Sequence, residues 1–332
     1  MQILNDKELL SIGNNIHDTK RRMDCSMDGL QMPSGMSVGS PVLKIRNIDK
    51  VLTFYEKEVG LRINKQYHDD NDDLIYELSS KYVPFSDKRA PLFILQHDPD
   101  ARDSTPHSAG LYHFAILVPN RRSLASTYAA LKSSGVHFDG FADHLVSESL
   151  YLRDPENNGI EIYRDRPARE WLRDSTGNVI MDTLPLDLQS LLSEVNEEET
   201  KNPKAFPSGA RIGHMHIKVT NLKRSIKFYH EKLMLDITLN WRSMGAAFLS
   251  AGGYHHHVGM NTWHSLNGKI LSNNDAGLKN FTMTIPDKSS FNSIKSIFLN
   301  DHTSERQKSQ KAENKQFLVL DPDGIQIVII SE

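Results

Sequence analysis

Two fifteen-residue segments of the chain carry nearly the same pattern of apolar and polar positions. They are NIDKVLTFYEKEVGL at residues 47–61 and NLKRSIKFYHEKLML at residues 221–235. Each follows a short stretch in which apolar and polar residues alternate, VLKIRNI and MHIKVTN, and each places a Phe-Tyr pair on an apolar helical face. The pattern predicts a strand followed by an amphipathic helix, repeated in the two halves of the chain.

Weaker copies of the same pattern lie between these segments and after them. LYHFAILVPN leads into RRSLASTYAALKSSGV, and LKNFTMTIPD leads into KSSFNSIKSIFLND. The closing phrases LRDPENNGIEIY and LDPDGIQIVI each combine an Asp-Pro turn and a glycine with a β-branched strand. We therefore predict an α+β protein of four βαβββ modules. The modules span residues 37–98, 108–165, 210–264 and 275–332.

The remaining segments connect or precede the modules. Residues 1–36, which end in a Gly-, Ser- and Pro-rich stretch, are expected to form a mobile leader. Modules one and two form a first half, residues 37–165, and modules three and four form a second half, residues 210–332. Residues 166–209 are expected to be a linker with one short helix, which DTLPLDLQSLLSEV predicts.

Composition and charge limit the classes of binding partner and the cellular compartment that we expect for this protein. With 39 Lys and Arg against 42 Asp and Glu, the chain has no basic excess for nucleic acid or an anionic membrane. It also lacks a run of the roughly 18 apolar residues that a membrane helix requires. A single cysteine, Cys25, allows no internal disulfide, so we expect a cytoplasmic protein. Metal chemistry would have to use the nitrogen and oxygen ligands that fifteen histidines and the acidic residues offer.

The modules and several phrases resemble a known family. LYHFAILVP, DHLVSESLYLRDPENNGIEIYRDRP, GHMHIKV and GGYHHHVGMNTW are similar to the vicinal-oxygen-chelate superfamily, which includes glyoxalases, bleomycin resistance proteins and extradiol dioxygenases. Within it, the bacterial catechol 2,3-dioxygenase type is the most similar, over about residues 38–332. The resemblance implies two paired, cup-shaped mixed β-sheets with helices outside. It does not define the reaction, because one scaffold serves several chemistries.

Strand periodicity selects the candidate metal ligands. In GHMHIKV, His214, His216 and Lys218 share one face, and the apolar residues share the other. His113 stands at the equivalent place in module two, five residues before a valine, as His214 does in module three. Glu161 lies between isoleucines on the last strand of module two, a costly place for an unpaired carboxylate. Two histidines and one carboxylate form the facial triad of non-haem iron(II) oxygenases. Each could instead be structural, with Glu161 paired to a nearby arginine.

The equivalent places in modules one and four hold no ligands. Ser40 and Asn280 stand where the triad histidines stand, and Gln326 replaces the carboxylate. We therefore predict one metal site shared by modules two and three, and a second, metal-free cup formed by modules one and four.

Further catalytic residues follow from the resemblance to extradiol dioxygenases. It implies an acid–base histidine on a strand of module three, and His257 is the first choice, with His255 on the same face as the alternative. His144 and Tyr151 match the family's supporting histidine and tyrosine, although they could be a turn cap and a half-buried strand aromatic. His216 is expected to touch the substrate.

These residues together predict a reaction. We expect an enzyme that uses Fe(II), or Mn(II) in its place, for extradiol (meta) cleavage of a catechol-type ring with O2. Its partners would be a small aromatic diol, O2 and a second copy of the chain in a homo-oligomer. The alternatives are a glyoxalase-like metal-dependent isomerase or lyase, and a non-catalytic small-molecule binding protein of the resistance type. No dinucleotide or phosphate-binding motif competes with these readings.

Overall fold

The computed structural model of the chain describes residues 32–80, 90–105, 107–175, 177–196, 198, 206–300 and 315–332. Residues 1–31 of the expected leader lie outside the described residues. For residues 32–36 the expectation of a mobile leader is wrong. Met32 and Met36 are only 4% and 3% exposed, and the N–H of Met32 donates to the Met234 carbonyl at 3.2 Å. Burial of two methionines therefore fixes this stretch against the core.

The helix of each module begins at a side chain that accepts a hydrogen bond from the backbone N–H three residues later. This satisfies one of the free donors at the start of a helix, and it explains why Asn or Asp recurs there. The caps are Asn47 for α2 (Ile48–Thr53), Asn120 for α3 (Arg121–Ser133), Asn221 for α6 (Leu222–Lys227) and Asp287 for α7 (Lys288–Leu299).

In modules one and three the helix widens into a π-helical turn at the Phe-Tyr pair. These turns are η1 (Phe54–Val59) and η3 (Phe228–Lys232). Their tyrosines, Tyr55 and Tyr229, are fully buried and donate hydrogen bonds of 3.2 Å to Asp154 and Asp321, respectively. Both aspartates belong to the Asp-Pro turn of the following module. Each half of the chain is therefore tied together by the same tyrosine–aspartate contact.

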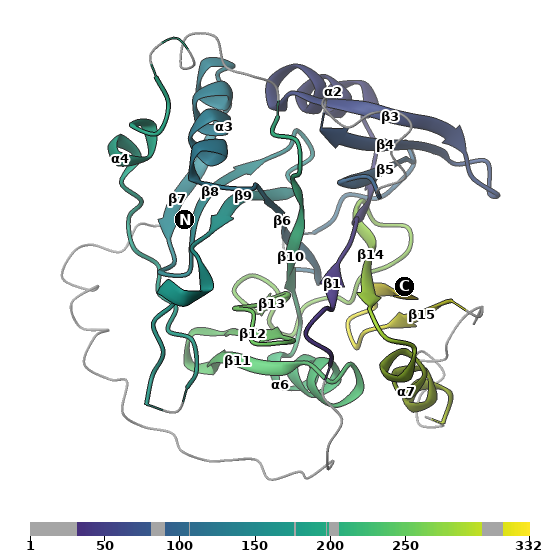
Figure 1. Cartoon of the computed structure of the whole chain (residues 1–332). Helices are drawn as coiled ribbons and strands as arrows, with labels where there is room; N and C mark the ends of the chain where they lie inside the picture. The colour runs from purple at the N-terminus through teal and green to yellow at the C-terminus, as the bar shows by residue number, and fades with distance from the viewer. Residues whose placement is uncertain are drawn as a thin grey trace. The chain divides into compact units, whose positions relative to one another are not determined.

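The strands form two eight-stranded mixed sheets (Figure 1), which confirms the fold class expected from the sequence. The first sheet contains β1 (Ser37–Val38), β2 (Val42–Ile45), β3 (Leu61–His68), β4 (Leu74–Ser80), β5 (Phe93–His97), β14 (Gly277–Ile285), β15 (Gln316–Leu320) and β16 (Gln326–Ser331). The second contains β6 (Gly110–Leu117), β7 (Phe138–Asp143), β8 (Ser147–Arg153), β9 (Gly159–Asp165), β10 (Arg211–Lys218), β11 (Asp236–Trp241), β12 (Ala246–Ser250) and β13 (Val258–Asn261).

Each sheet combines modules from opposite halves of the chain. In the second sheet, β10 of module three lies antiparallel beside β6 of module two, in the order β11-β12-β13-β10-β6-β9-β8-β7. In the first sheet, β14 of module four lies beside β2 of module one. The connection across residues 166–209 includes a 3-10 turn, η2 (Ala168–Glu170), and α4 (Leu188–Leu192); another 3-10 turn, η4 (Arg242–Met244), precedes β12.

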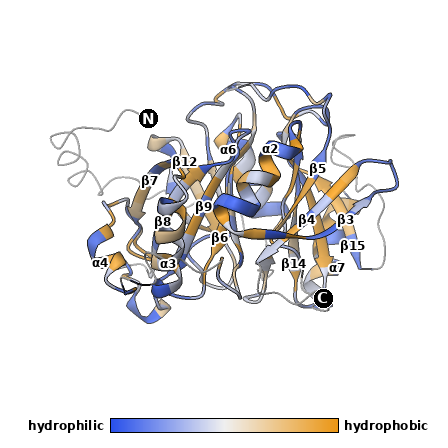
Figure 2. Cartoon of the chain, turned by 90° about the horizontal axis from the view of Figure 1, so that it is seen from above, coloured by the Kyte–Doolittle hydropathy of each residue, from blue (hydrophilic) through white to orange (hydrophobic). Residues whose placement is uncertain are grey.

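Apolar residues lie along many of the strands, as Figure 2 shows by the hydropathy of each residue. On β10, Met215 and Ile217 are fully buried in the main hydrophobic cluster. His214 and His216 lie on the other side of β10. We call this side the inner face of the second sheet. These histidines are also buried, and buried polar side chains require partners.

Candidate metal centre

Three neighbouring strands of the second sheet bring His113, Glu161 and His214 together. In the strand register, Ala115 of β6 lies opposite Glu161 of β9 on one side and opposite His214 of β10 on the other. His113 is two residues before Ala115, so its side chain lies on the same face. Because alanine is small and fully buried there, the side chains of Glu161 and His214 can meet above it.

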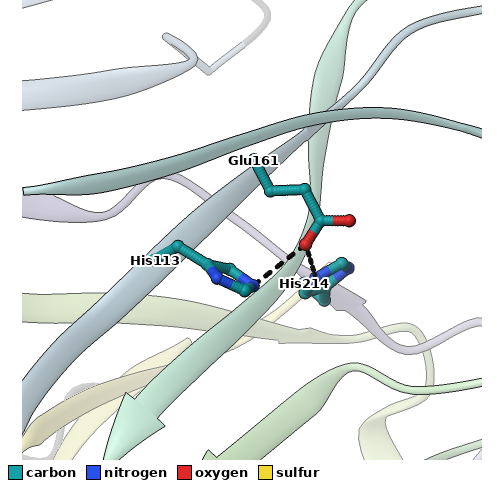
Figure 3. Close-up of side chains that lie close together, drawn as sticks. All are labelled: His113, Glu161 and His214. Atoms are coloured by element: carbon teal, nitrogen blue, oxygen red, sulfur yellow. Dashed lines mark hydrogen bonds and ion pairs between the residues drawn. The ribbon is translucent and has the colours of Figure 1, made fainter. Parts of the chain in front are cut away.

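The two histidines converge on one oxygen of Glu161 (Figure 3). Nε2 of His113 lies 2.9 Å from Oε2 of Glu161, and Nε2 of His214 lies 3.0 Å from the same oxygen. The other oxygen, Oε1, accepts a hydrogen bond of 2.6 Å from the Ser149 hydroxyl. Ser149 therefore fixes the rotation of the carboxylate and leaves Oε2 for the histidines.

These distances fit a shared metal ion. Two donors at right angles, each about 2.1 Å from an ion, are about 3.0 Å apart. Nε2 of His113 is also buried without a hydrogen-bond partner among the described residues, although it lies 2.9 Å from Glu161. This nitrogen is therefore placed to share an ion with Glu161. Within the described part of the chain, this is the one group of three such residues close enough to share a metal.

Electrostatics favour the charge states that a metal requires. Burial raises the pKa of Glu161, but the neighbouring His214 and His113 together outweigh burial and hold this pKa well below its usual range. For His214, burial lowers the pKa, and Glu161 only partly opposes this. A carboxylate anion and a neutral imidazole are the ligand forms that bind divalent metals.

Tyr151 and His144 form a hydrogen-bonded pair beside the triad. The ring centroid of Tyr151 lies 5.6 Å from that of His113, and its hydroxyl lies 2.7 Å from Nε2 of His144. Nδ1 of His144 is 2.8 Å from the carbonyl of Asp182, which can only accept, so Nδ1 carries the proton. In the neutral ring, Nε2 therefore accepts from the Tyr151 hydroxyl. Burial, and then the charge of Glu161, raise the pKa of Tyr151 well above its usual value.

His216 lies on the other side of His113. Its ring centroid is 4.8 Å from that of His113 and 4.9 Å from that of Tyr112, and its Nε2 is 3.0 Å from Nδ2 of Asn261. Burial, followed by repulsion from the neighbouring histidines, lowers the pKa of His216 well below its ordinary value. It therefore contributes a neutral ring to the wall of the site.

The histidine triplet at residues 255–257 lies in a turn before β13, not on a strand as expected. Strand alternation therefore does not apply to the triplet. The expectation that His255 and His257 share one face of a strand is corrected. The ring of His256 is nearest to His214, at 4.1 Å between centroids, against 6.2 Å for His255. His255 instead contacts Asp165, at 2.9 Å. The sequence offered no signal for His256, because only the turn decides where its ring points.

His257 is held by its own turn. Its Nδ1 lies 2.9 Å from the Ser250 hydroxyl and accepts from the N–H of Ala251 at 3.3 Å. Burial, and then the charges of His255 and His214, lower the pKa of His257 to about 3. Acid–base catalysis is favoured by a pKa near neutrality, and the pKa of His257 lies well below that range.

Sequence reasoning also missed Tyr112. The register between β6 and β10 slips after the pairing of His216 with His113, so Ile217 pairs with Leu111 and Tyr112 is left over. Such a bulge re-aims a side chain. The ring of Tyr112 consequently lies beside His113, His216 and Trp263, at centroid distances of 5.3, 4.9 and 5.2 Å.

The equivalent places of modules one and four hold only neutral side chains. Asn280 of β14 lies opposite Gln326 of β16 and, on its other side, opposite Val42 of β2. Gln326 donates a hydrogen bond of 2.9 Å to the side chain of Asn273, and the hydroxyl of Ser40 donates to the Pro91 carbonyl. The polar groups of Gln326 and Ser40 thus form hydrogen bonds to segments next to the first sheet.

Paired βαβββ modules with a His, Glu and His cluster on three central strands define a vicinal-oxygen-chelate fold with a candidate metal site. The family model described as "Glyoxalase/Bleomycin resistance protein/Dioxygenase superfamily" matches residues 38–162. A catechol-2,3-dioxygenase of Bacillus subtilis is 39% identical over 250 residues, which cover 75% of this chain and 82% of that protein. The chain belongs to this superfamily, which confirms the resemblance seen in the sequence.

Solved structures support the same fold. A crystal structure of a Bacillus subtilis protein matches with a TM-score of 0.57 at 11% identity, over 91% of this chain and 86% of that one. Glyoxalase I from Zea mays matches with a TM-score of 0.52 at 15% identity, over 89% of this chain and 92% of that one. None of the helices in the described part of the chain has the length and apolar character of a membrane span.

Proposed function

We propose that this protein is a non-haem Fe(II)-dependent extradiol dioxygenase, which opens a catechol-type ring beside the diol with O2. The observation that carries the proposal is the convergence of Nε2 of His113 and Nε2 of His214 on one oxygen of Glu161. Such a donor set would hold iron through His113, Glu161 and His214 and would leave positions open for a diol and O2. The name of the Bacillus subtilis relative, catechol-2,3-dioxygenase, agrees with that chemistry.

Bound iron would lower the pKa of the diol hydroxyls and bring the ring and O2 together, so that both oxygen atoms enter a ring-opened semialdehyde acid. The protein's part is to hold the ligands and to move protons. Glu161 supplies the negative charge of the triad, and Ser149 keeps its orientation fixed. The rings of His216 and Tyr112 supply an aromatic wall against which a substrate ring can lie.

For proton transfer, geometry favours the Tyr151–His144 pair. The Tyr151 hydroxyl lies near the triad and donates to Nε2 of His144, so a proton can pass from a substrate oxygen through Tyr151 to the imidazole. His256 lies against His214 and is the nearer member of the histidine triplet. The sequence assigns proton transfer to His257, with His255 as the alternative. This assignment stays a prediction, to be tested together with the Tyr151–His144 pair.

The glyoxalase-like alternative generally requires a fourth protein ligand, commonly a second carboxylate. Among the described residues, only Glu161 supplies a carboxylate to the cluster, which favours the dioxygenase. A small-molecule binding protein would need no ligand set of this kind. Mn(II) in place of iron, a cytoplasmic location and a homo-oligomer remain part of the proposal; the location rests on the single cysteine.

The test is oxygen uptake after anaerobic loading of the purified chain with Fe(II) and addition of catechol. We expect stoichiometric consumption of O2 and catechol, with a yellow product that absorbs in the visible range. Metal-free protein and Zn(II)-loaded protein serve as controls and should consume no O2. The glyoxalase-like alternative would be favoured if the protein isomerised a glutathione hemithioacetal and consumed no O2 when catechol is added.

A further inference from the structure

The inner face of the second sheet is closed at one end and open at the other. At the end toward residue 165, Tyr163 and His255 are fully buried, and the hydroxyl of Tyr163 lies 2.8 Å from that of Tyr254. At the opposite end, Trp263 is 49% exposed and Tyr112 is half-buried. The part of a substrate that points away from the metal must therefore face this second, open end.

Lys218 lies on the inner face at the open end. It shares the face of His214 and His216 on β10, because the residues between them, including Ile217, are buried in the core. Lys218 is half-buried, and no described residue forms a hydrogen bond or ion pair with its ammonium group. A half-buried lysine packs its aliphatic stem against the protein and leaves its ammonium group for water or an anion. Burial, and then the charge of Arg153, lower the pKa of Lys218, as expected where an anion is missing.

A second cation lies across the open end. Arg153 follows Tyr151 on the same face of β8, and it pairs with Asp139 at 2.7 Å. Arg153 lies opposite Gly159 of β9, and Lys218 lies opposite Gly110 of β6, so neither cation has a side chain directly opposite it on these strands. Lys218, Arg153 and Asp139 together leave an excess of one positive charge at this end of the inner face.

We propose that Lys218 binds an anionic substituent of the substrate, so that the preferred substrate is a catechol that carries a carboxylate on a side chain. This inference rests on the proposed function and names its substrate class. Along β10, His214 and Lys218 are about 13 Å apart, and both side chains stand off the same face of the sheet. This separation leaves room between them for a metal-bound catechol ring with a short side chain that ends in a carboxylate. Tyr112 and Trp263 would contact that ring and side chain.

The experiment compares 3-(3,4-dihydroxyphenyl)propanoate with its amide, which has the same shape and no charge. Binding to the Fe(II)-loaded protein is measured by calorimetry without O2, and kcat and KM are measured with O2. We expect the wild type to bind the acid roughly 10- to 100-fold more tightly than the amide, the usual range for a charged hydrogen bond. K218M should remove this preference, mainly through KM, while K218R should retain part of it. K223M, at an exposed lysine of α6, is the matched control and should keep the preference.

Equal affinity of the wild type for acid and amide would overturn the assignment, and so would a preference that survives in K218M. Equal affinity in the wild type would overturn the assignment even if K218M does not fold, and K218R then provides the second variant. Failure of the proposed function gives a different result. Then the acid would bind in a Lys218-dependent manner, but neither it nor catechol would be opened by O2.

Discussion

At the scale of single residues, Glu161 is the side chain on which the candidate site depends most. It supplies the negative charge of the triad, and both histidines meet at its Oε2. Burying a carboxylate is costly, and only its partners make it tolerable. A buried carboxylate whose pKa is held well below its usual range by its neighbours is typical of a functional site.

We therefore expect Glu161→Gln to lose most of its iron while the fold survives, because a neutral amide is a poor ligand for a divalent ion. Elemental analysis after Fe(II) loading and gel filtration measures this. Ser149→Ala removes only the hydrogen bond to Oε1, and we expect a smaller loss of metal affinity, roughly 10- to 100-fold. Full iron content in Glu161→Gln would remove Glu161 from the ligand set.

The choice of the proton-transfer residue gives a second prediction. Tyr151→Phe should keep its iron and lose roughly 100-fold or more in kcat, the usual size of an acid–base contribution. His257→Ala should retain most of the activity, because the turn holds its Nδ1 and its pKa is about 3. The assignment made from the sequence predicts the reverse order, so steady-state kinetics of the two iron-loaded variants distinguish them.

At the scale of elements, the site depends on how closely β9 approaches β6. A Cβ atom added to Gly159 would lie 2.0 Å from the carbonyl oxygen of Tyr112 and 3.1 Å from the Cβ of His113. The first of these atoms belongs to the backbone, so the two strands would have to separate. This approach accommodates the bulge at Tyr112 and keeps Glu161 within reach of His113.

Gly159→Ala should therefore lower the free energy of unfolding by at least about 1–3 kcal/mol and reduce iron content. Gly140→Ala on β7 is the matched control, because an added Cβ meets nothing within 4 Å there. Its unfolding free energy should stay within about 0.5 kcal/mol of wild type. Chemical denaturation measures both. Equal stability of the two variants would show that the strands can move apart freely.

At the scale of the whole molecule, the two halves use carboxylates at equivalent positions to join their modules. The carboxylate of Glu156 in the Asp-Pro turn of module two accepts from the backbone N–H groups of Arg46 and Asn47 before α2. Asp323 in module four accepts from Thr220 and Arg224 at the start of α6. These contacts, with the two tyrosine–aspartate pairs, link strands of the first sheet to strands of the second.

The pair formed by Tyr229 and Asp321 predicts a pH dependence of stability. Burial, and then the charge of Asp323, raise the pKa of Asp321 to about 7 from an ordinary value of 3.8. Asp321 then binds a proton more tightly in the folded chain than in the unfolded chain. Its contribution to the free energy of unfolding is therefore fully present below about pH 4. It is lost as the pH rises to about 7, by at most about 4 kcal/mol.

The side chain in Asp321→Asn cannot titrate. The free energy of unfolding of this variant, relative to that of the wild type, should therefore increase between pH 4 and pH 7 and stay constant above pH 7. Urea unfolding at several pH values measures the difference. Parallel curves over the whole range would contradict the raised pKa of Asp321.

The sequence by itself determined the modules, their helix starts and the candidate ligands. Repeats, capping residues such as Asn47 and Asn221, and strand alternation are local, and local patterns can be read without knowing what lies opposite. Alternation placed His214, His216 and Lys218 on one face of a strand. The equivalent positions of His113 and His214 followed from the repeat.

Only the tertiary structure decided what these residues meet. The pairing of Ala115 with both Glu161 and His214, the bulge at Tyr112, and the contact of His256 with His214 all depend on register and turn geometry. These arise from contacts between segments far apart in the chain, which no local periodicity encodes. The triplet was misplaced for this reason: on a strand its rings would alternate, whereas in a turn packing decides where each one points.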